Sequence, residues 1–537
     1  MDLDGAKVVK EWSAGVERQI LDLRKIPRPR LGDLFGGVSV ALVLIPQSIA
    51  NASLAGLPPV VGLFASAFPL LVFALFASSP YLQTGPVALT SLLTAGALIG
   101  AGFDVGTPDY IAAAALLALI VGVTRLLVGV TRLGSLVYLM AEPVTIGFTS
   151  GAGLVILSSQ LSRALGVSLP ANVAAEENPI VRALWTVVNP GEWQISAILF
   201  SVVTLALMLL GKRVHRLFPG VLIAVVVTLA FSRITNYGGA VIGPIPSGLP
   251  TLNLALPWGS IGSLITGGVV IALIGFAEPA SIARAFATES QTRWSSSREF
   301  IASGFANLVA GATGAYPVGG SFARSSVNKI AGAETRWSGA VTAIFMLAFL
   351  PFSFLLDGLP DAVLGAVVIG AVVSLLKPRR LWQFRTRSPY QASLAYLTFF
   401  ATLISPPNIH YAVLFGIGVT VLLHVVRPFS LQSMATEDGG LALRPWGLLW
   451  VGTNSRFAKA LTDAIEADSG SGPVTVSLER STAIDAATAA SIVSGQETAE
   501  LAGREFAVRN PPRGAEVVLS GFGVPVIANS HPSNEAS

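Results

Sequence analysis

Two charged side chains lie within otherwise apolar stretches, where a charge has chemical consequences. Arg324 follows a glycine-rich break, and Glu278 precedes Pro279 in an apolar run. An arginine at membrane depth costs roughly 2.5–3.5 kcal/mol, so it is expected to face the protein interior or water. Arg324 could therefore complete an anion site, or it could extend toward the cytoplasm beside Lys329.

Glu278 is a carboxylate on a predicted apolar helix. An ionisable group at this depth is a functional hypothesis by default, because burying it unpaired is costly. Glu278 could carry a coupling proton or bind a cation, and it could also form a structural ion pair with Arg324. These roles can coexist.

Two amides, Gln47 and Asn51, lie four residues apart. A helix places such residues on one face. On a membrane-spanning helix they could contact a polar substrate, or they could form hydrogen bonds to neighbouring helices.

Two short apolar segments begin after stretches rich in helix-breaking residues, 81–86 and 315–320. Each is third in a set of seven, which is typical of an inverted-repeat transporter. A helix that begins inside the membrane presents free N–H groups and the positive end of its dipole, which favour an anion. The breaks could also be simple kinks. The candidate donors are Val87, Ala88, Phe322 and Ala323.

The elements that position these residues belong to a membrane protein. Of the 537 residues, 52% are hydrophobic and 12% are charged, against roughly 25% charged in soluble domains. The predicted spans are 33–54, 59–78, 86–101, 110–130, 134–161, 193–211, 217–232, 259–285, 299–314, 321–332, 337–356, 360–376, 390–405 and 409–427. They predict fourteen helices in two inverted repeats of seven.

The domain boundaries follow from changes in composition. We expect a cytoplasmic segment (1–32), a transmembrane region (33–427, with repeats 33–232 and 258–427), a small α/β domain (430–525) and a disordered tail (526–537). In the α/β domain we expect strands at Leu448–Val451, Val474–Leu478 and Glu505–Val508, and helices at 454–467, 485–497 and 513–521.

Basic residues gather in the loops that an inside N-terminus would place in the cytoplasm. They are Arg125, Arg132, Lys212, Arg213, Arg216, Arg284, Arg293, Arg298, Lys329, Arg336, Lys377, Arg379, Arg380, Arg385 and Arg387. Arg163, Arg182 and Arg233 contradict the trend. The pattern predicts cytoplasmic termini and a bacterial inner (plasma) membrane.

Several function classes are excluded by the sequence. There is no cysteine, and the four histidines lack metal-ligand spacing. No P-loop motif or catalytic motif is present, so we expect neither an ATP-driven pump nor an enzyme, and no cofactor. The net charge of +4 comes from topology-setting loops, so nucleic acid is not an expected partner.

The breaks and their flanking residues resemble those of the sulfate permease (SulP) family of anion transporters. The resemblance is carried by Leu44-Ile-Pro-Gln47-Ser48-Ile-Ala, Thr84-Gly85-Pro86-Val87-Ala88, Gly147-Phe148-Thr149 and Gly319-Gly320-Ser321-Phe322-Ala323-Arg324. These blocks run through most of the membrane region in the family's order.

The resemblance implies a core domain and a gate domain, a homodimer and elevator-like movement of the core. It implies a substrate site formed by Gln47, Asn51, Val87, Ser321, Ala323 and Arg324, although an aromatic residue is common at the position of Asn51. Glu278 corresponds to the coupling acid, and Ile282 replaces the hydroxyl of sodium-coupled members. That difference favours H⁺ over Na⁺ coupling.

The C-terminal segment resembles the family's STAS domain. Ala486 replaces the phosphorylatable residue of regulatory STAS proteins, so dimer contact or a cytosolic protein partner is the expected role. The predicted function is secondary transport of a small inorganic or carboxylate anion across the lipid bilayer, with sulfate as first candidate. The alternatives are bicarbonate or a C4-dicarboxylate, sodium coupling, or an anion channel.

Overall fold

The computed structural model describes residues 27–131, 142–290, 294–373, 375–387, 389–426, 430–436, 439–446, 454–479, 486–511 and 515–527. They form two compact units, Met1–Ile417 and Gly418–Ser537, and each is described by itself.

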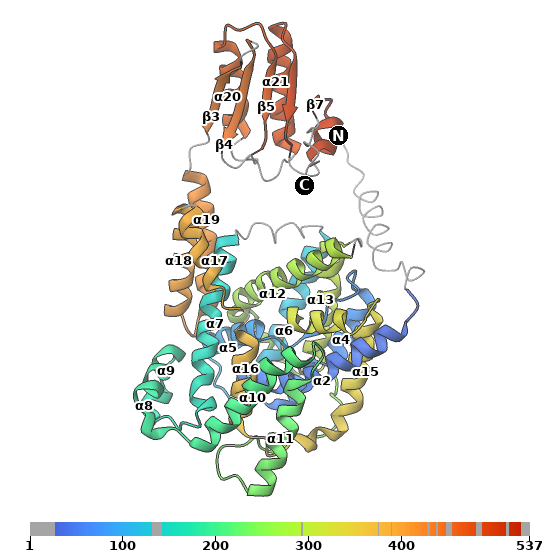
Figure 1. Ribbon diagram of the computed structural model, residues 1–537, viewed down its shortest axis with the longest axis vertical. Helices are drawn as coiled ribbons and strands as arrows, with labels where there is room; N and C mark the ends of the chain where they lie inside the picture. The colour runs from blue at the N-terminus through green and yellow to red at the C-terminus, as the bar shows by residue number, and fades with distance from the viewer. Residues whose placement is uncertain are drawn as a thin grey trace. The chain divides into compact units, whose positions relative to one another are not determined.

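The first unit is predominantly helical (Figure 1). The helices that correspond to the predicted spans are α2 (Leu31–Leu54), α3 (Pro59–Ala65), α4 (Phe68–Phe76), α5 (Ala88–Gly100), α6 (Pro108–Val130), α7 (Glu142–Ala164), α10 (Ile195–Val214), α11 (Gly220–Thr235), α12 (Ile261–Glu289), α13 (Ser296–Ala312), α14 (Phe322–Ile330), α15 (Trp337–Phe349), α16 (Asp361–Val372), α18 (Pro389–Ile404) and α19 (Ile409–Val426). Each predicted span overlaps at least one of them.

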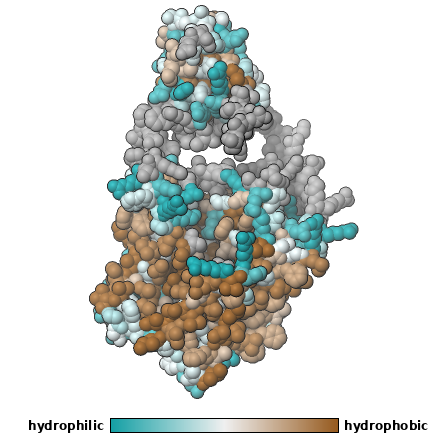
Figure 2. All heavy atoms as spheres, in the orientation of Figure 1, coloured by the Kyte–Doolittle hydropathy of each residue, from teal (hydrophilic) through white to brown (hydrophobic). Residues whose placement is uncertain are grey.

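Six helical segments of the described chain are long and apolar enough to cross a membrane, and shorter apolar helices accompany them. Their outward faces are apolar as well. Large side chains of α10 such as Ile195 (85% exposed) and Val202 (56% exposed) point outward. Figure 2 shows apolar atoms over most of the visible face of this unit. Such a surface is stable in lipid, where no polar coat is needed.

Three short helices were not predicted: α8 (Ala171–Ala174), α9 (Pro179–Val188) and α17 (Pro378–Arg387). The residues at the start of α9 are typical of a helix N-terminus. Asn178 caps it by accepting a hydrogen bond from the Ile180 N–H at 2.9 Å, and Pro179 occupies its first turn. The expected second span is broken into α3 and α4, which are joined through Ser66 and Ala67.

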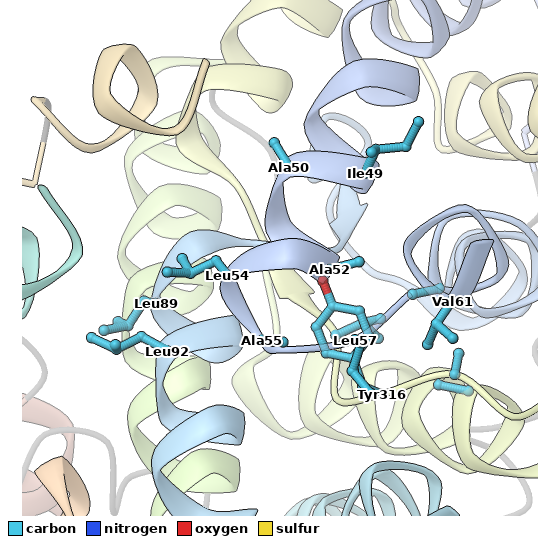
Figure 3. Packing of buried hydrophobic residues seen from close by; sticks show 14 of the residues in the cluster. Ile49, Ala50, Ala52, Leu54, Ala55, Leu57, Val61, Leu89, Leu92 and Tyr316 are labelled. Atoms are coloured by element: carbon cyan, nitrogen blue, oxygen red, sulfur yellow. The ribbon is translucent and has the colours of Figure 1, made fainter. Parts of the chain in front are cut away.

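The helices of the first unit pack in two groups. In the core group, α6 packs on α12 and α13, α4 on α13 and α15, and α2 on α3, α14 and α15, while α5 contacts α2 and α12. In the gate group, α7 packs on α9, α16 and α18, and α10 packs on α11 and α16. Figure 3 shows buried residues of α2 and α5, including Leu54, Leu89 and Leu92, in the apolar cluster of this unit.

The charge pattern suggested that Arg125 lies in a loop, but the structure places it elsewhere. It lies in α6 with no exposed surface. Its guanidinium donates to the carbonyl oxygens of Ile271, Ala272 and Val318 and to Ser303 Oγ, at 2.8–3.3 Å. One buried cation therefore joins α6 to α12, to α13 and to the chain that leads into the second break.

The second unit contains a five-stranded sheet in the order β3-β4-β5-β6-β7. Its strands are β3 (Ser430–Ala435), β4 (Leu441–Trp446), β5 (Val474–Ser477), β6 (Phe506–Arg509) and β7 (Val526–Ile527). β3 and β4 are antiparallel, and the other pairs are parallel. The helices are α20 (Asn454–Ala467), α21 (Ala486–Leu501) and α22 (Ala515–Gly521).

Two of the predicted strands and all three predicted helices of this region are confirmed to within four residues at each end. The β3–β4 hairpin was not predicted, and the strand expected at Leu448–Val451 lies outside the described residues. The predicted start of the disordered tail at residue 526 is wrong, because Val526 and Ile527 form β7 and pair with β6. Apolar side chains of α20, α21 and the parallel strands form one cluster. This small α/β region is consistent with a STAS domain.

Candidate functional site

The two breaks meet through a short strand pair. β1 (Thr84–Gly85) and β2 (Gly319–Gly320) are buried and antiparallel, with Thr84 opposite Gly320. α5 and α14 begin directly beyond these strands. Equivalent segments of an inverted repeat run in opposite directions, so the antiparallel pairing agrees with the predicted repeat. It brings the two half-helix starts together.

Glycine is required at this junction. Gly85 has a φ of +146°, a conformation that side-chain-bearing residues rarely adopt. A Cβ on Gly320 would lie 3.0 Å from side-chain carbons of Leu82 and Pro279. The close approach places β2 against α12 at the residue that follows Glu278.

Arg324 is buried between the two starts, with 1% of its surface exposed. Nη1 donates to the Pro86 carbonyl oxygen at 2.8 Å, so the side chain does not extend toward the cytoplasm beside Lys329. Nε and Nη2 are buried and have no hydrogen-bond partner among the described residues. Unpaired donors of a buried cation are costly, and a small anion would satisfy them.

Asn51 donates from Nδ2 to the same Pro86 carbonyl oxygen, at 3.2 Å. The amide therefore joins α2 to the chain that precedes α5, beside Arg324. Gln47, one turn earlier on α2, is also buried. Within the described part of the chain its side chain has no hydrogen-bond partner, so the amide remains available to a ligand.

The two half-helix starts differ in exposure. Val87 caps α5 and, like Ala88, is partly buried, whereas Phe322 and Ala323 in the first turn of α14 are exposed. Ser321 caps α14, and its Oγ accepts from the Arg324 N–H at 3.5 Å. The first N–H groups of both helices lack intrahelical acceptors. The α14 start is the more open of the two.

Glu278 lies in α12 and is partly buried. It forms no direct ion pair with Arg324 among the described contacts, but the two charges interact electrostatically, as do Glu278 and Lys377. The direct ion pair with Arg324, which the sequence left open, is therefore not formed among the described contacts. Lys377 follows α16, so the carboxylate of Glu278 is influenced by positive charges from both helix groups.

Two interactions that support the site were not predicted. Gln83 receives a hydrogen bond from Ser321 N–H at its carbonyl (3.0 Å) and donates its own N–H to Ser325 Oγ (2.9 Å). The buried Tyr316 hydroxyl lies 3.1 Å from Ser91 Oγ. The first fixes the start of α14, and the second ties α5 to the chain before β2. The sequence showed that both segments interrupt helices, but helix-breaking residues do not indicate which residues these segments will contact.

Residues 31–402 match the profile described as the sulfate permease family. A probable sulfate transporter of Mycobacterium tuberculosis is 35% identical over 421 residues, covering 76% of this chain and 73% of the relative. The chloroplastic sulfate transporter 4.1 of Arabidopsis thaliana is 33% identical over 405 residues, covering 72% of this chain and 57% of the relative. The structure of SLC26A9 superposes with a TM-score of 0.73 at 18% identity, covering 99% of this chain and 93% of that one, and shows a shared fold.

Proposed function

This chain belongs to the sulfate permease family of anion transporters, and from that premise we propose that it is a proton-coupled carrier of sulfate. The observation that carries the proposal is the buried Arg324 guanidinium, whose Nε and Nη2 are unpaired between two converging half-helix starts. An anion bound there would accept from the guanidinium and from free N–H groups of α5 and α14.

Sulfate is favoured over bicarbonate and C4-dicarboxylates by the names of the relatives. Those at 35% and 33% identity are both named as sulfate transporters. A tetrahedral dianion also suits a site with several donors that approach from opposite helices. Gln47, Asn51, Val87, Ala88, Ser321, Phe322, Ala323 and Arg324 are the proposed ligands or ligand-positioning residues.

Proton coupling is proposed for Glu278. Its carboxylate interacts electrostatically with Arg324 and Lys377 without a direct ion pair to Arg324. An anion that neutralises Arg324 would remove part of the stabilisation of the carboxylate, so anion binding would favour proton uptake. Ile282, one turn later, supplies no side-chain oxygen ligand for Na⁺.

Elevator movement is proposed for the core group, because the site residues all belong to it. α2, α5, α12 and α14 pack on one another or on α6 and α15. A rigid core could therefore carry the bound anion past the gate group without dismantling the site. We also propose a homodimer in a bacterial inner membrane with cytoplasmic termini, and a dimer-contact or partner-binding role for the STAS-like region.

The test is uptake of radiolabelled sulfate, bicarbonate and fumarate into proteoliposomes, with and without an inward proton gradient. We expect saturable sulfate uptake that the gradient accelerates. Glu278→Gln is expected to bind sulfate but to lose the acceleration. Wild-type protein with a matching sodium gradient is the control.

Other outcomes would redirect the proposal. Saturable uptake of bicarbonate or fumarate instead of sulfate would change the substrate. A full proton response in Glu278→Gln would remove the coupling role. Non-saturating, voltage-driven sulfate currents would indicate a channel.

A further inference from the structure

A cavity lies at the other end of α5 from Arg324. It has a volume of about 250 Å³, far more than the ~10–15 Å³ that one water centre requires. Its walls come from the ends of α2 and α5 on one side, and from α7, α9 and the α18–α19 connection on the other. The cavity thus lies between the core group and the gate group.

Two of the three arginines that contradict the charge pattern line this cavity. Arg163 comes from the last turn of α7 and Arg182 from α9. The third exception, Arg233, lies elsewhere and donates to the carbonyl oxygens of Leu355 and Asp357. Arginines on the side opposite the cytoplasm go against the positive-inside rule, so each needs an explanation. Hydrogen bonds to backbone carbonyl oxygens explain only Arg233.

The partners of the two cavity arginines are incomplete. Arg163 Nη2 lies 3.3 Å from an oxygen of Asp361. The half-buried Arg182 side chain has no hydrogen bond or ion pair with the residues that the structure describes. One carboxylate, the exposed Glu177, also lines the cavity. Arg182 therefore brings to the cavity wall a positive charge that no hydrogen bond or ion pair among the described residues satisfies.

The oxygen of a buried amide in the same wall also lacks a partner. Gln160 is 3% exposed, and its Oε1 has no hydrogen-bond partner among the described residues. Its Nε2 donates to Ser159 Oγ at 3.1 Å. Rotation of the amide by 180° would exchange these atoms and present N–H donors to the cavity instead.

A continuous face of α5 connects the cavity to the site at Arg324. Leu92, Ala95, Gly96 and Ile99 line the cavity at helical spacing, and α5 begins beside Pro86. Leu54, Leu89 and Leu92 are buried between these ends and lie near one another in Figure 3. An apolar layer therefore separates the cavity from the break site.

We propose that this cavity is an outer anion site, in which Arg182, Arg163 and Gln160 hold a small oxyanion at the face predicted to lie away from the cytoplasm. The direction in which the anion moves through the cavity depends on the proposed transport function. Anion binding in the cavity does not depend on it. A site between the two helix groups would load or release the anion when the leucine layer opens.

The test uses the natural absence of cysteine. Ser53→Cys places one thiol in the cavity wall, at a residue with no hydrogen-bonded side chain among the described contacts. The purified full chain is labelled with a sulfonate-bearing or a trimethylammonium-bearing methanethiosulfonate, each with and without sulfate. Rates are normalised to a free cysteine derivative.

We expect faster labelling by the anionic reagent and protection by sulfate, including in the Arg324→Gln background. Arg182→Gln should lower the anionic-to-cationic rate ratio by about three- to tenfold and abolish protection, since it removes one nearby charge. Arg182→Lys should retain both effects, and Arg233→Gln, the matched control, should change neither.

The proposal is overturned by no labelling, by the same rate ratio with and without Arg182, or by protection that Arg324→Gln abolishes. Failure of the proposed transport function gives a different result. In that case wild-type proteoliposomes take up no sulfate, whereas sulfate still protects Ser53→Cys.

Discussion

Arg324 and Pro86 are joined by a hydrogen bond of 2.8 Å although 238 positions separate them in the chain. The bond connects the chain before α5 to the first turn of α14, and Asn51 donates to the same carbonyl oxygen. The shared carbonyl oxygen holds the guanidinium in place through Nη1. Nε and Nη2 have no hydrogen-bond partner among the described residues. The site is therefore positioned before any anion arrives.

Gly85→Ala is predicted to reduce transport more than it reduces stability. The substitution places a Cβ at a φ of +146° and 3.5 Å from Arg324 Nη2. Backbone strain of this kind costs about 1–3 kcal/mol. Gly106→Ala is the matched control, because Gly106 has a φ of +88° and nothing within 4 Å of its would-be Cβ.

Thermal unfolding and sulfate uptake of both variants check this prediction. Both are expected to melt at lower temperature than wild type, whereas only Gly85→Ala should raise the KM for sulfate. Equal uptake by the two variants would show that Nη2 does not contact the anion.

Arg125→Met is predicted to destabilise the first unit. The substitution removes the guanidinium that donates to the carbonyl oxygens of Ile271, Ala272 and Val318 and so joins α6 to α12 and to the chain before β2. Hydrogen bonds from a charged group contribute about 1.5–3 kcal/mol each. We expect poor accumulation or a melting temperature lower by at least several degrees, as measured by fluorescence-detected unfolding of the purified protein.

Arg324→Gln serves as the contrast in the same assay. It removes a buried charge with two unpaired nitrogens, so its melting temperature without sulfate should equal or exceed that of wild type. A stable Arg125→Met protein would contradict the structural role assigned to Arg125.

Disulfide cross-links are predicted to have different effects within the core group and between the two groups. A cross-link within the core group should leave transport intact, whereas one between the groups should block it. A Cβ on Gly339 would lie 3.3 Å from the Ala74 Cβ, and both residues belong to the core group. A Cβ on Gly100 of α5 would lie 3.1 Å from Asn408 Cγ, beside the gate group. The first separation is close to the Cβ–Cβ distance of a disulfide. The second shows that position 100 and the Asn408 side chain are neighbours.

The double-cysteine variants can be made directly, since the chain has no cysteine of its own. Oxidised Ala74→Cys/Gly339→Cys protein should keep transporting sulfate. Oxidised Gly100→Cys/Asn408→Cys protein should stop, and a reductant should restore it. Transport by the second cross-linked variant would contradict elevator movement.

The break segments show what the sequence could predict about the site. Gly85-Pro86 and Gly319-Gly320 indicated two helix starts within the membrane, and the starts meet through β1 and β2. The spacing of Gln47 and Asn51 placed them on one helix face, and Asn51 reaches Pro86. These features depend on local patterns, which a single sequence contains.

Arg125 and Gln83 show which features the sequence could not predict. Arg125 lies near the end of an apolar run, where a loop charge and a buried charge have the same sequence pattern. Its carbonyl partners come from residues about 150 positions away or more, and they depend on how α6 turns against α12. The backbone of Gln83 holds the start of α14, and backbone contacts leave no trace in residue type.

The most direct test of the central claim is saturable uptake of radiolabelled sulfate by proteoliposomes that contain wild-type, Arg324→Lys or Arg324→Gln protein. Charge-assisted hydrogen bonds contribute about 1.5–3 kcal/mol each, so loss of one or more should raise the KM at least tenfold in Arg324→Gln. Arg324→Lys, which keeps the charge without the planar fork, should be intermediate. An unchanged KM in a folded Arg324→Gln protein would contradict an anion site between α5 and α14.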